Sequence, residues 1–415
     1  MWGKRRAVIT GIGVVAPNGI GRQAFWDSLL ACRSGVGPVT LFDTVGFPPM
    51  AAGEVKDFRL TDFVNANGLD PRRLARHTQL ALVAAKFALE DAGLALDVLR
   101  TRSPFPLIMG VSTSAADVFM RHWQLQTKLG PTNVGHHMIG SGRPHAVTEA
   151  LTRFLQLPLS LSTVSTACVA GAEAVARGAH LVVTGASDIA IAGAADAPVT
   201  AFGMAGFLSS KLVPRIDGMD PSTVSRPFDR DRIGGFPAEG SAVLIIEELR
   251  SALARGARIY AEIAGSCSNS DEPDEEPSAG LSRTMRGALA GAGLVAGDVD
   301  YICAAGPSDP VLDRVETAAI KAALGAAAYR VPVTSIKGAT GNPLSAAGPL
   351  QIAAAAMAVA GGLVPPTVNY EHPDPACDLD YVPRAPRFAR LGAAVVNAHG
   401  LGGTNFSVVL RRVDQ

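Results

Sequence analysis

The chain has 415 residues, 48% of them hydrophobic, and its 37 Lys and Arg balance its 37 Asp and Glu. This length suffices for one large or two fused globular units, and a formal net charge of zero argues against a nucleic-acid partner. Five scattered cysteines without a Cys-x-x-Cys pair argue against structural disulfides and metal sites. No signal-peptide pattern opens the sequence, and its apolar runs are short or interrupted by charges, so we expect a cytoplasmic protein without a membrane partner.

Short β-branched runs alternate with Ala-rich, helix-like stretches along the whole chain. The clearest examples, in chain order, are the segments 6–15, 21–35, 180–193, 313–325, 329–335 and 348–362. Alternation of this kind is typical of an α/β fold whose sheets are covered on both faces. The sequence therefore predicts an α/β protein with buried sheets.

The pattern restarts near residue 255. There "RIYAEIAGSCSNS" (258–270) resembles a second copy of "RAVITGIGVVAPN" (6–18), so we predict two related halves, 1–255 and 256–415. The stretch "SDEPDEEPSAG" (270–280) carries five acids among prolines. Such a composition forms no core element and predicts a solvated surface loop.

A cysteine among small residues stands out at "VSTACVAG" (164–171), between an apolar run and an Ala-rich run. This is the pattern of a strand-to-helix turn that exposes a nucleophile. The helix dipole favours a thiolate at a helix N-terminus, so we expect the pKa of Cys168 to lie below the usual value of about 8.5. Backbone N–H groups at such a turn can also hold an oxyanion.

The motif "STACVAG" resembles the nucleophile elbow of β-ketoacyl-acyl-carrier-protein synthases, and the likeness covers nearly the whole chain. "AVITGIGVVAPNG" resembles that family's opening strand, the segment 225–263 its link between halves, and "SIKGATGNPLSAAG" and "NAHGLGGTN" its lysine and closing glycine motifs. The resemblance implies a thiolase-like αβαβα five-layer fold made of two related halves, and a dimer. It also implies fatty-acid or polyketide chemistry on acyl groups carried by the phosphopantetheine of an acyl carrier protein, with no other cofactor and no metal.

Departures from the family pattern are concentrated around the predicted site. The family's first histidine opens a His-Gly-Thr-x-Thr motif, and here that position is Ala305. The two threonines, which in the family bond the pantetheine arm, fall on Pro307 and Asp309. The second histidine corresponds to Asn342, whereas Lys337 stands in its expected place.

These exchanges remove the groups that drive decarboxylation of a malonyl extender in the family. Alanine cannot transfer a proton, and asparagine donates hydrogen bonds without titrating near neutrality. Loss of one positioned acid–base group commonly slows a reaction by ~10²–10⁴. We therefore expect this chain to perform no appreciable decarboxylative condensation.

Other positions are candidates for a relocated base or for the substrate pocket. His399 stands where the family usually has phenylalanine, and the His136–His137 pair aligns with an aromatic segment that reaches across the family's dimer. Leu401 matches the family's gating phenylalanine, which predicts a smaller or more permissive acyl gate. We place Phe228 at the pocket mouth. Each position also has a plainer interpretation, as a residue that packs in an interface, a core residue or a substitution of one hydrophobic residue for another.

Two interpretations of Cys168 follow from the resemblance. The first, which the sequence favours, is a chain-length-factor-like subunit that pairs with an active ketosynthase and limits chain growth. The second is a Cys168-dependent acyltransferase or cyclase, which needs a base but no decarboxylation. An ordinary condensing enzyme and a carrier-binding scaffold are less favoured.

Overall fold

The computed structural model describes residues 5–65, 68–102 and 104–414. Two sets of five strands, with the two-residue β2 (Gly19–Ile20) paired beside β1, form one continuous sheet among the described residues. In spatial order the first set is β6 (Leu159–Val164), β5 (Phe105–Gly110), β7 (Ile189–Asp196), β8 (Gly240–Glu248) and β1 (Ala7–Ala16). The second is β11 (Val333–Thr334), β10 (Tyr301–Cys303), β14 (Ala393–Gly400), β15 (Thr404–Arg411) and β9 (Ala261–Ser270).

Both sets have the same internal order. When the five strands of each set are numbered in chain order, both sets have the spatial order 3-2-4-5-1. The first strands of the two sets, β1 and β9, pair antiparallel in the middle of the sheet. The change from one set to the other falls between the end of β8 at Glu248 and the start of β9 at Ala261.

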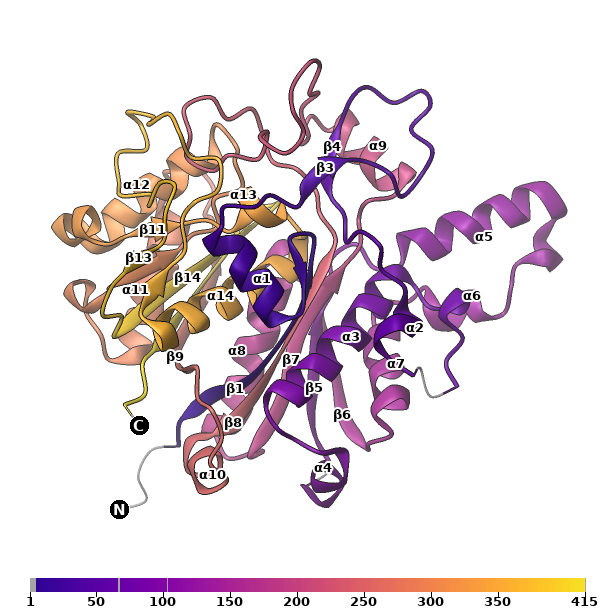
Figure 1. Ribbon diagram of the computed structural model, residues 1–415, viewed down its shortest axis with the longest axis horizontal. Helices are drawn as coiled ribbons and strands as arrows, with labels where there is room; N and C mark the ends of the chain where they lie inside the picture. Colours follow the sequence, from indigo (N-terminus) through magenta and orange to yellow (C-terminus); the bar gives the residue numbers. More distant parts are fainter. Residues whose placement is uncertain (1–4, 66–67, 103, 415) are drawn as a thin grey trace.

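Helices form three layers around these two sets of strands (Figure 1). The first set packs against α3 (Arg76–Asp91) and α7 (Ala146–Leu155) on its outer face, and the second set against α11 (Ala279–Ala292), which in turn packs on α12 (Leu312–Leu324). Between the sets lie α8 (Ala170–Val183) and α14 (Ala347–Gly361), which contact each other and strands of both halves. This is the α-β-α-β-α layering that the sequence predicts.

The central helix α14 is apolar all round because protein covers it on every side. The stretch Leu344–Gly361 is long and apolar enough to span a membrane by composition, and 89% of it is buried inside the protein. It crosses α8 at very short range. A Cβ on Gly348 would lie 2.7 Å from both the Cβ and the backbone nitrogen of Ala172. The close contact of the two helices therefore depends on small residues.

An arm made of α5 (Ala116–Leu129) and α6 (His137–Ser141) projects from the body of the molecule (Figure 1). Its large apolar side chains are unusually exposed, at 68% for Trp123, 61% for Leu129 and 59% for Ile139. Nearby, β6 is the outermost strand of its set, and Leu161 on it is also exposed. Arm and strand together leave apolar surface and an unpaired strand edge on one side of the molecule.

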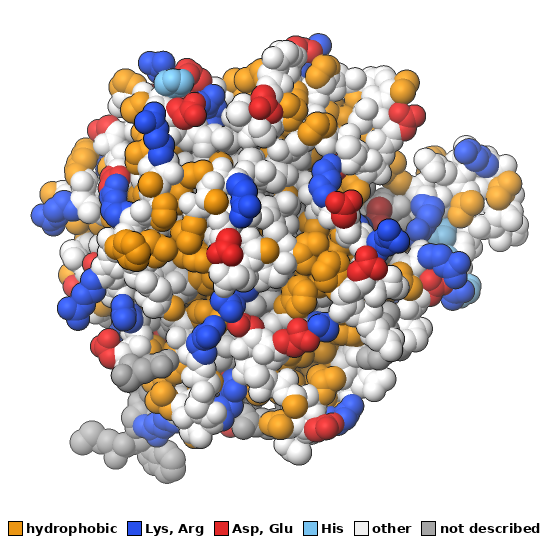
Figure 2. All heavy atoms as spheres, in the orientation of Figure 1, with side chains coloured by type: hydrophobic (Ala, Val, Ile, Leu, Met, Phe, Trp, Pro, Cys, Tyr) orange, Lys and Arg blue, Asp and Glu red, His pale blue; other side chains and the backbone are white. Residues whose placement is uncertain are grey.

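Charges of both signs are interspersed over the face drawn in Figure 2. The predicted acidic loop is mostly exposed, and two of its acids, Glu272 and Glu275, pair with Arg283 of α11. Its first acid, Asp271, is half-buried and accepts a hydrogen bond from Asn405 near the end of the chain. The remaining helices are α1 (Arg22–Leu30), α2 (Leu60–Phe63), α4 (Leu96–Arg102), α9 (Ala201–Ser209), α10 (Leu249–Ala254) and α13 (Lys337–Thr340).

The contact between α8 and α14 generates a stability prediction. Gly348→Ala would force the two helices apart, and we expect it to lower the free energy of unfolding by about 1–3 kcal/mol, as overpacking does. Gly361→Ala, at the exposed end of the same helix with open space around its Cβ, is the matched control and should be neutral or slightly stabilising. Urea denaturation followed by circular dichroism measures both. Equal effects of the two substitutions would contradict the role given to Gly348.

Candidate active site

Cys168 lies at a tight turn between β6 and α8. It is the middle residue of a short 3₁₀ segment, Ala167–Val169, that leads directly into α8. Ala167 has φ = 54°, a left-handed conformation that side chains other than glycine rarely adopt. Strained residues of this kind cluster at functional sites. The strand-to-helix turn that the sequence predicts around the thiol is therefore present.

The turn opens into a cavity of about 290 Å³. Most of the predicted site residues line it, namely Cys168, Ala305, Pro307, Lys337, Asn342, His399 and Leu401. They come from both halves of the chain, and the second half supplies all of them except Cys168. Pro277, Leu281, Leu312 and Val315 add apolar surface. The structure thus brings together residues that lie far apart in the sequence.

The other three predicted pocket residues lie outside this cavity. Asp309 accepts hydrogen bonds from the backbone N–H groups of Val311 and Leu312 at the start of α12, at 2.8 and 2.9 Å. Phe228 is completely buried and stacks on Tyr381 with ring centroids 4.0 Å apart. Phe228 is not among the residues that line the cavity, and its ring packs in the core of the second half, as in its interpretation as a core residue.

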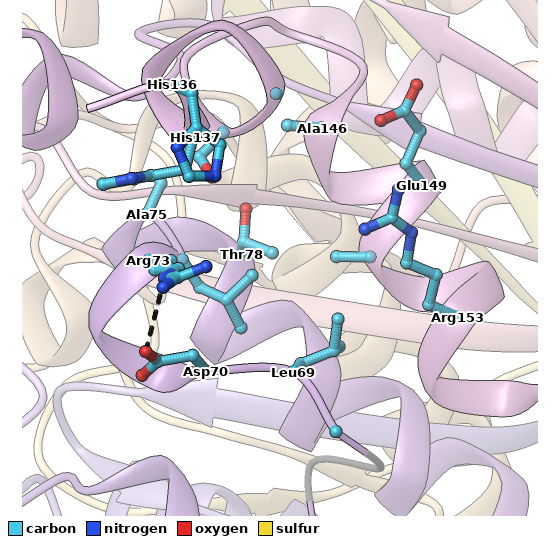
Figure 3. A pocket seen from close by; sticks show the side chains of 15 residues that line it. Leu69, Asp70, Arg73, Ala75, Thr78, His136, His137, Ala146, Glu149 and Arg153 are labelled. Carbon is cyan, nitrogen blue, oxygen red and sulfur yellow. Dashed lines mark ion pairs between the residues drawn. The ribbon is translucent and has the colours of Figure 1, made fainter. Parts of the chain in front are cut away.

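His137, the third of these residues, lines a separate cavity of about 380 Å³ together with His136, Arg73 and Arg153 (Figure 3). Its Nε2 lies 3.2 Å from Nε2 of His122, whose Nδ1 accepts the backbone N–H of Gly135. Burial and neighbouring positive charges lower the pKa of His137. The histidine pair of the arm is therefore joined to α5 and is not part of the Cys168 cavity of the same chain.

Burial dominates the electrostatics of Cys168. The thiol pKa is raised above its ordinary value, chiefly because burial disfavours the thiolate and also because Asp196 is close. Lys337 and the backbone N–H groups of Leu401 and of Cys168 itself act in the opposite direction. The lowered pKa expected from the helix terminus alone was wrong, since desolvation outweighs these favourable contributions.

Lys337 is the charged side chain that most favours the Cys168 thiolate. It is 5% exposed at the start of α13, and burial lowers its own pKa against the attraction of Cys168 and Glu316. The buried ammonium of Lys337 favours the thiolate of the half-buried Cys168, and the thiolate in turn favours the ammonium.

A buried carboxylate holds the loop that carries Ala305. Glu316 on α12 accepts the backbone N–H groups of Ala305 and Gly306 at 2.9 and 2.7 Å, and it also accepts the side chain of Asn397 at 3.1 Å. These bonds fix the backbone at the position where the family resemblance places the first histidine. The methyl group of Ala305 leaves room in the cavity there but offers no proton.

Asn342 lines the cavity and carries an unpaired side-chain acceptor. Its backbone is fixed by hydrogen bonds with Phe236 and Ala238, at 2.7 and 2.9 Å. Its side-chain Oδ1 is buried without a hydrogen-bond partner among the described residues. A buried carbonyl oxygen in this condition carries an uncompensated desolvation cost.

Two residues that sequence reasoning missed support His399. Asn405 stands opposite His399 in the β14–β15 pairing, and its Oδ1 lies 2.8 Å from Nδ1 of His399. The Nδ2 of Asn405 donates to Asp271 at 2.7 Å. The signal was the spacing in "NAHGLGGTN", where a tight turn between two strands sets the histidine and the last asparagine side by side.

One group with metal-ligand spacing occurs among the described residues, formed by Asp229, Asp231 and His372. The carboxylate of Asp229 already accepts the backbone N–H groups of Asp231, Glu371 and His372, each at 2.7–2.8 Å. Because Arg226 lies 3.1 Å from the same carboxylate, its charge opposes a cation there. We assign no metal to this group.

Comparison with known proteins gives the same family along the whole chain. Residues 4–252 match the family described as "Beta-ketoacyl synthase, N-terminal domain", and residues 260–371 match "Beta-ketoacyl synthase, C-terminal domain". The chain belongs to the β-ketoacyl synthase family. It is 37% identical to the "Tetracenomycin polyketide synthase ketoacyl synthase alpha subunit" of Streptomyces glaucescens, over 99% of this chain and 97% of that protein. It is 36% identical to "3-oxoacyl-[acyl-carrier-protein] synthase 2" of a Synechocystis species, over 99% of this chain and 98% of that one.

Solved structures of β-ketoacyl synthases have the same fold. "The ishigamide ketosynthase/chain length factor" superposes with a TM-score of 0.90 at 31% identity, covering 99% of this chain and 100% of that one. An acyl-carrier-protein–ketosynthase complex, "AntDE:AntF (apo)", gives a TM-score of 0.89 at 30% identity with the same coverage. The thiolase-like fold predicted from the sequence is confirmed, and the chain is a ketosynthase-family protein similar to polyketide and fatty-acid synthases.

The electrostatics of Lys337 and Cys168 predict a pH-dependent reactivity. Lys337→Met removes a charge that favours the thiolate, so the pKa of Cys168 should rise above its already raised wild-type value. Alkylation by iodoacetamide should then be slower near neutral pH, with its pH profile displaced to higher pH. Mass spectrometry of the Cys168 peptide measures the rate.

Lys321→Met is the control, because this lysine on α12 pairs with Asp378 and is not among the charges that act on Cys168. Its profile should coincide with that of the wild type. A Lys337→Met profile that coincides with the wild type, or moves to lower pH, would contradict the role given to Lys337.

Proposed function

We propose that this ketosynthase-family protein transfers acyl groups through Cys168 without decarboxylative condensation. The donor is an acyl thioester on the phosphopantetheine of an acyl carrier protein. The acceptor is an amine, an alcohol or a carbon nucleophile within the acyl chain, so the protein acts as an acyltransferase or cyclase in polyketide or fatty-acid-type assembly. The observation that carries the proposal is the position of Cys168, which lies just before α8 in a cavity that Gly400 and Leu401 also line, where the N–H groups of Leu401 and of Cys168 itself favour the thiolate.

Two backbone N–H groups beside a thiol are suited to stabilise the oxyanion of a tetrahedral intermediate. The end of β14 lies directly against the elbow, since a Cβ on Gly400 would lie 3.5 Å from the Cys168 nitrogen. A subunit with a purely structural role has no need of this arrangement. The geometry therefore favours the acyl-transfer interpretation over the subunit interpretation that the sequence favoured.

The remaining cavity lining supports chemistry without decarboxylation. Ala305 and Asn342 stand where the family resemblance places two histidines, and neither side chain transfers a proton near neutrality. Pro307 has no hydroxyl for the pantetheine arm and Asp309 is engaged at the start of α12. Carrier binding here then depends on contacts other than those two hydroxyls.

Acylation of Cys168 tests the proposal. The wild-type protein incubated with an acyl-loaded carrier protein should gain the mass of one acyl group, seen by intact-protein mass spectrometry. Cys168→Ala should gain none, while Cys267→Ala, which removes another half-exposed thiol, should behave as the wild type. When the acylated wild type or the acylated Cys267→Ala variant is given a malonyl-loaded carrier protein, it should release no carbon dioxide and should not lengthen its acyl group. Absence of any acyl adduct on the wild type would overturn the proposal.

A second function, the chain-length-factor-like subunit, is favoured by the apolar arm and the free edge of β6. Those surfaces fit a dimer, either of two copies of this chain or of this chain with an active ketosynthase. The structural neighbour described as a ketosynthase/chain length factor supports the second arrangement.

Co-expression with a ketosynthase tests this second function. A chain-length factor should co-purify with the synthase, and the pair should make products of unchanged length and rate when Cys168 is replaced by Ala. Loss of product formation with Cys168→Ala in an intact pair would instead favour acyl transfer. Trp123→Glu, on the exposed arm, should weaken the assembly because it places a charge in an apolar contact.

A further inference from the structure

We propose that His399 is the base for Cys168 and that Asn405 and Asp271 act as positioning residues that hold its imidazole in one tautomer. The inference rests on the proposed function, because it concerns the proton transfers of acyl transfer at the same cavity. Cys168, His399 and Asn405 all line that cavity. Nucleophile, base and orienting group are the three parts of a cysteine–histidine catalytic arrangement.

The orientation of the Asn405 amide is fixed by its partners. One end of the amide faces Oδ1 of Asp271 at 2.7 Å and the carbonyl oxygen of Gly403 at 3.2 Å. An ionised carboxylate and a carbonyl only accept hydrogen bonds, so this end must be the NH₂ group. The other end, which faces His399, is therefore the carbonyl oxygen.

This orientation decides which nitrogen of His399 carries the proton. Oδ1 of Asn405 only accepts, and it lies 2.8 Å from Nδ1 of His399. In the neutral imidazole Nδ1 must then be the donor, which leaves the lone pair on Nε2. Nε2 has no hydrogen-bond partner among the described residues, although the ring lines the Cys168 cavity. The Cys168 thiol is also not a partner of Nε2 in this structure, so the proton transfer requires the two groups, which share one cavity, to approach each other when the acyl donor is bound.

Asp271 is built into this arrangement by close packing. A Cβ on Gly280 would lie 2.1 Å from Asp271 Oδ1, and a Cβ on Gly403 would lie 2.7 Å from Oδ2. The backbone N–H of Asp271 also donates to the carbonyl of Gly403 at 2.8 Å. Two glycines thus make room for the carboxylate, which in turn sets the amide of Asn405. The start of the acidic loop is therefore part of this arrangement, whereas Glu272, Asp274 and Glu276 are exposed.

The two half-reactions balance with His399 as proton carrier. In the first, Nε2 takes the thiol proton, the sulfur attacks the thioester carbonyl, and the carrier thiol leaves with that proton. In the second, an amine or alcohol attacks the acyl-Cys168 carbonyl, its proton passes to Nε2, and the leaving Cys168 sulfur recovers it. Both tetrahedral intermediates place their oxyanion near the N–H groups of Cys168 and Leu401.

The experiment uses the whole chain and a hexanoyl thioester of N-acetylcysteamine as the probe, with acylation of Cys168 timed by intact-protein mass spectrometry. His399→Phe should slow acylation by at least ~10², the usual effect of losing a general base. Asn405→Ala should slow it by about tenfold or more, since the imidazole can then adopt the unproductive tautomer. His180→Gln, which removes an exposed histidine on α8, is the control and should leave the rate unchanged.

A tautomer measurement separates positioning from folding. Nitrogen NMR of the wild type should show His399 protonated at Nδ1 and bare at Nε2, and Asn405→Ala should yield a mixture of tautomers. Two results would overturn this inference and leave the proposed function standing. One is acylation of His399→Phe at the wild-type rate, and the other is an NMR spectrum of the wild type in which Nε2 of His399 carries the proton. Absence of acylation in the wild type would remove the proposed function itself.

Discussion

The contact between α8 and α14 is the constraint on which the rest of the structure depends. Each helix belongs to a different half, and each uses small residues where they meet, because a Cβ on Gly171 would lie 2.1 Å from the carbonyl oxygen of Ser345. The N-terminus of α8 carries Cys168, so this contact decides what the thiol faces. Asp196, at the end of β7, reinforces the contact by accepting the backbone N–H of Ser345 at 3.0 Å and those of Ser112 and Thr113.

Burial of the elbow has an electrostatic cost and a catalytic use. The same desolvation that raises the pKa of the Cys168 thiol strengthens the action of every dipole and charge that faces it. A thiol in this condition reacts slowly unless a neighbouring group takes its proton. Lys337 supplies charge that favours the thiolate, and in the proposed mechanism His399 supplies the site for the proton.

Much of the fold could be predicted from the sequence, because long alternating runs such as those of β7, β8 and α14 carry strong patterns. The α/β class and the layered fold followed from these runs and from the family motifs. The identical strand order of the two sets could not, since β10 and β11 are three and two residues long and carry too little pattern. Their places are set by parallel pairing with β14 and with each other.

Site residues that belong to recognisable sequence motifs could be predicted, whereas residues placed by tertiary contacts could not. Cys168, Lys337 and Asn342 sit in recognisable segments, and all three line one cavity. The motif around Phe228 says nothing about the direction of its ring, which stacks on Tyr381 in the core. Asp271 was missed because composition alone predicted a uniformly solvated loop. Its carboxylate packs closely against Gly280 and Gly403, which the composition does not reveal.

The unpaired oxygen of Asn342 has a consequence for stability. Because this oxygen is buried in the folded chain without a partner among the described residues, it carries a desolvation penalty of about 1–3 kcal/mol that folding does not recover. An aliphatic residue of equal size at this position would lack the polar atom, so the folded chain would not carry that penalty.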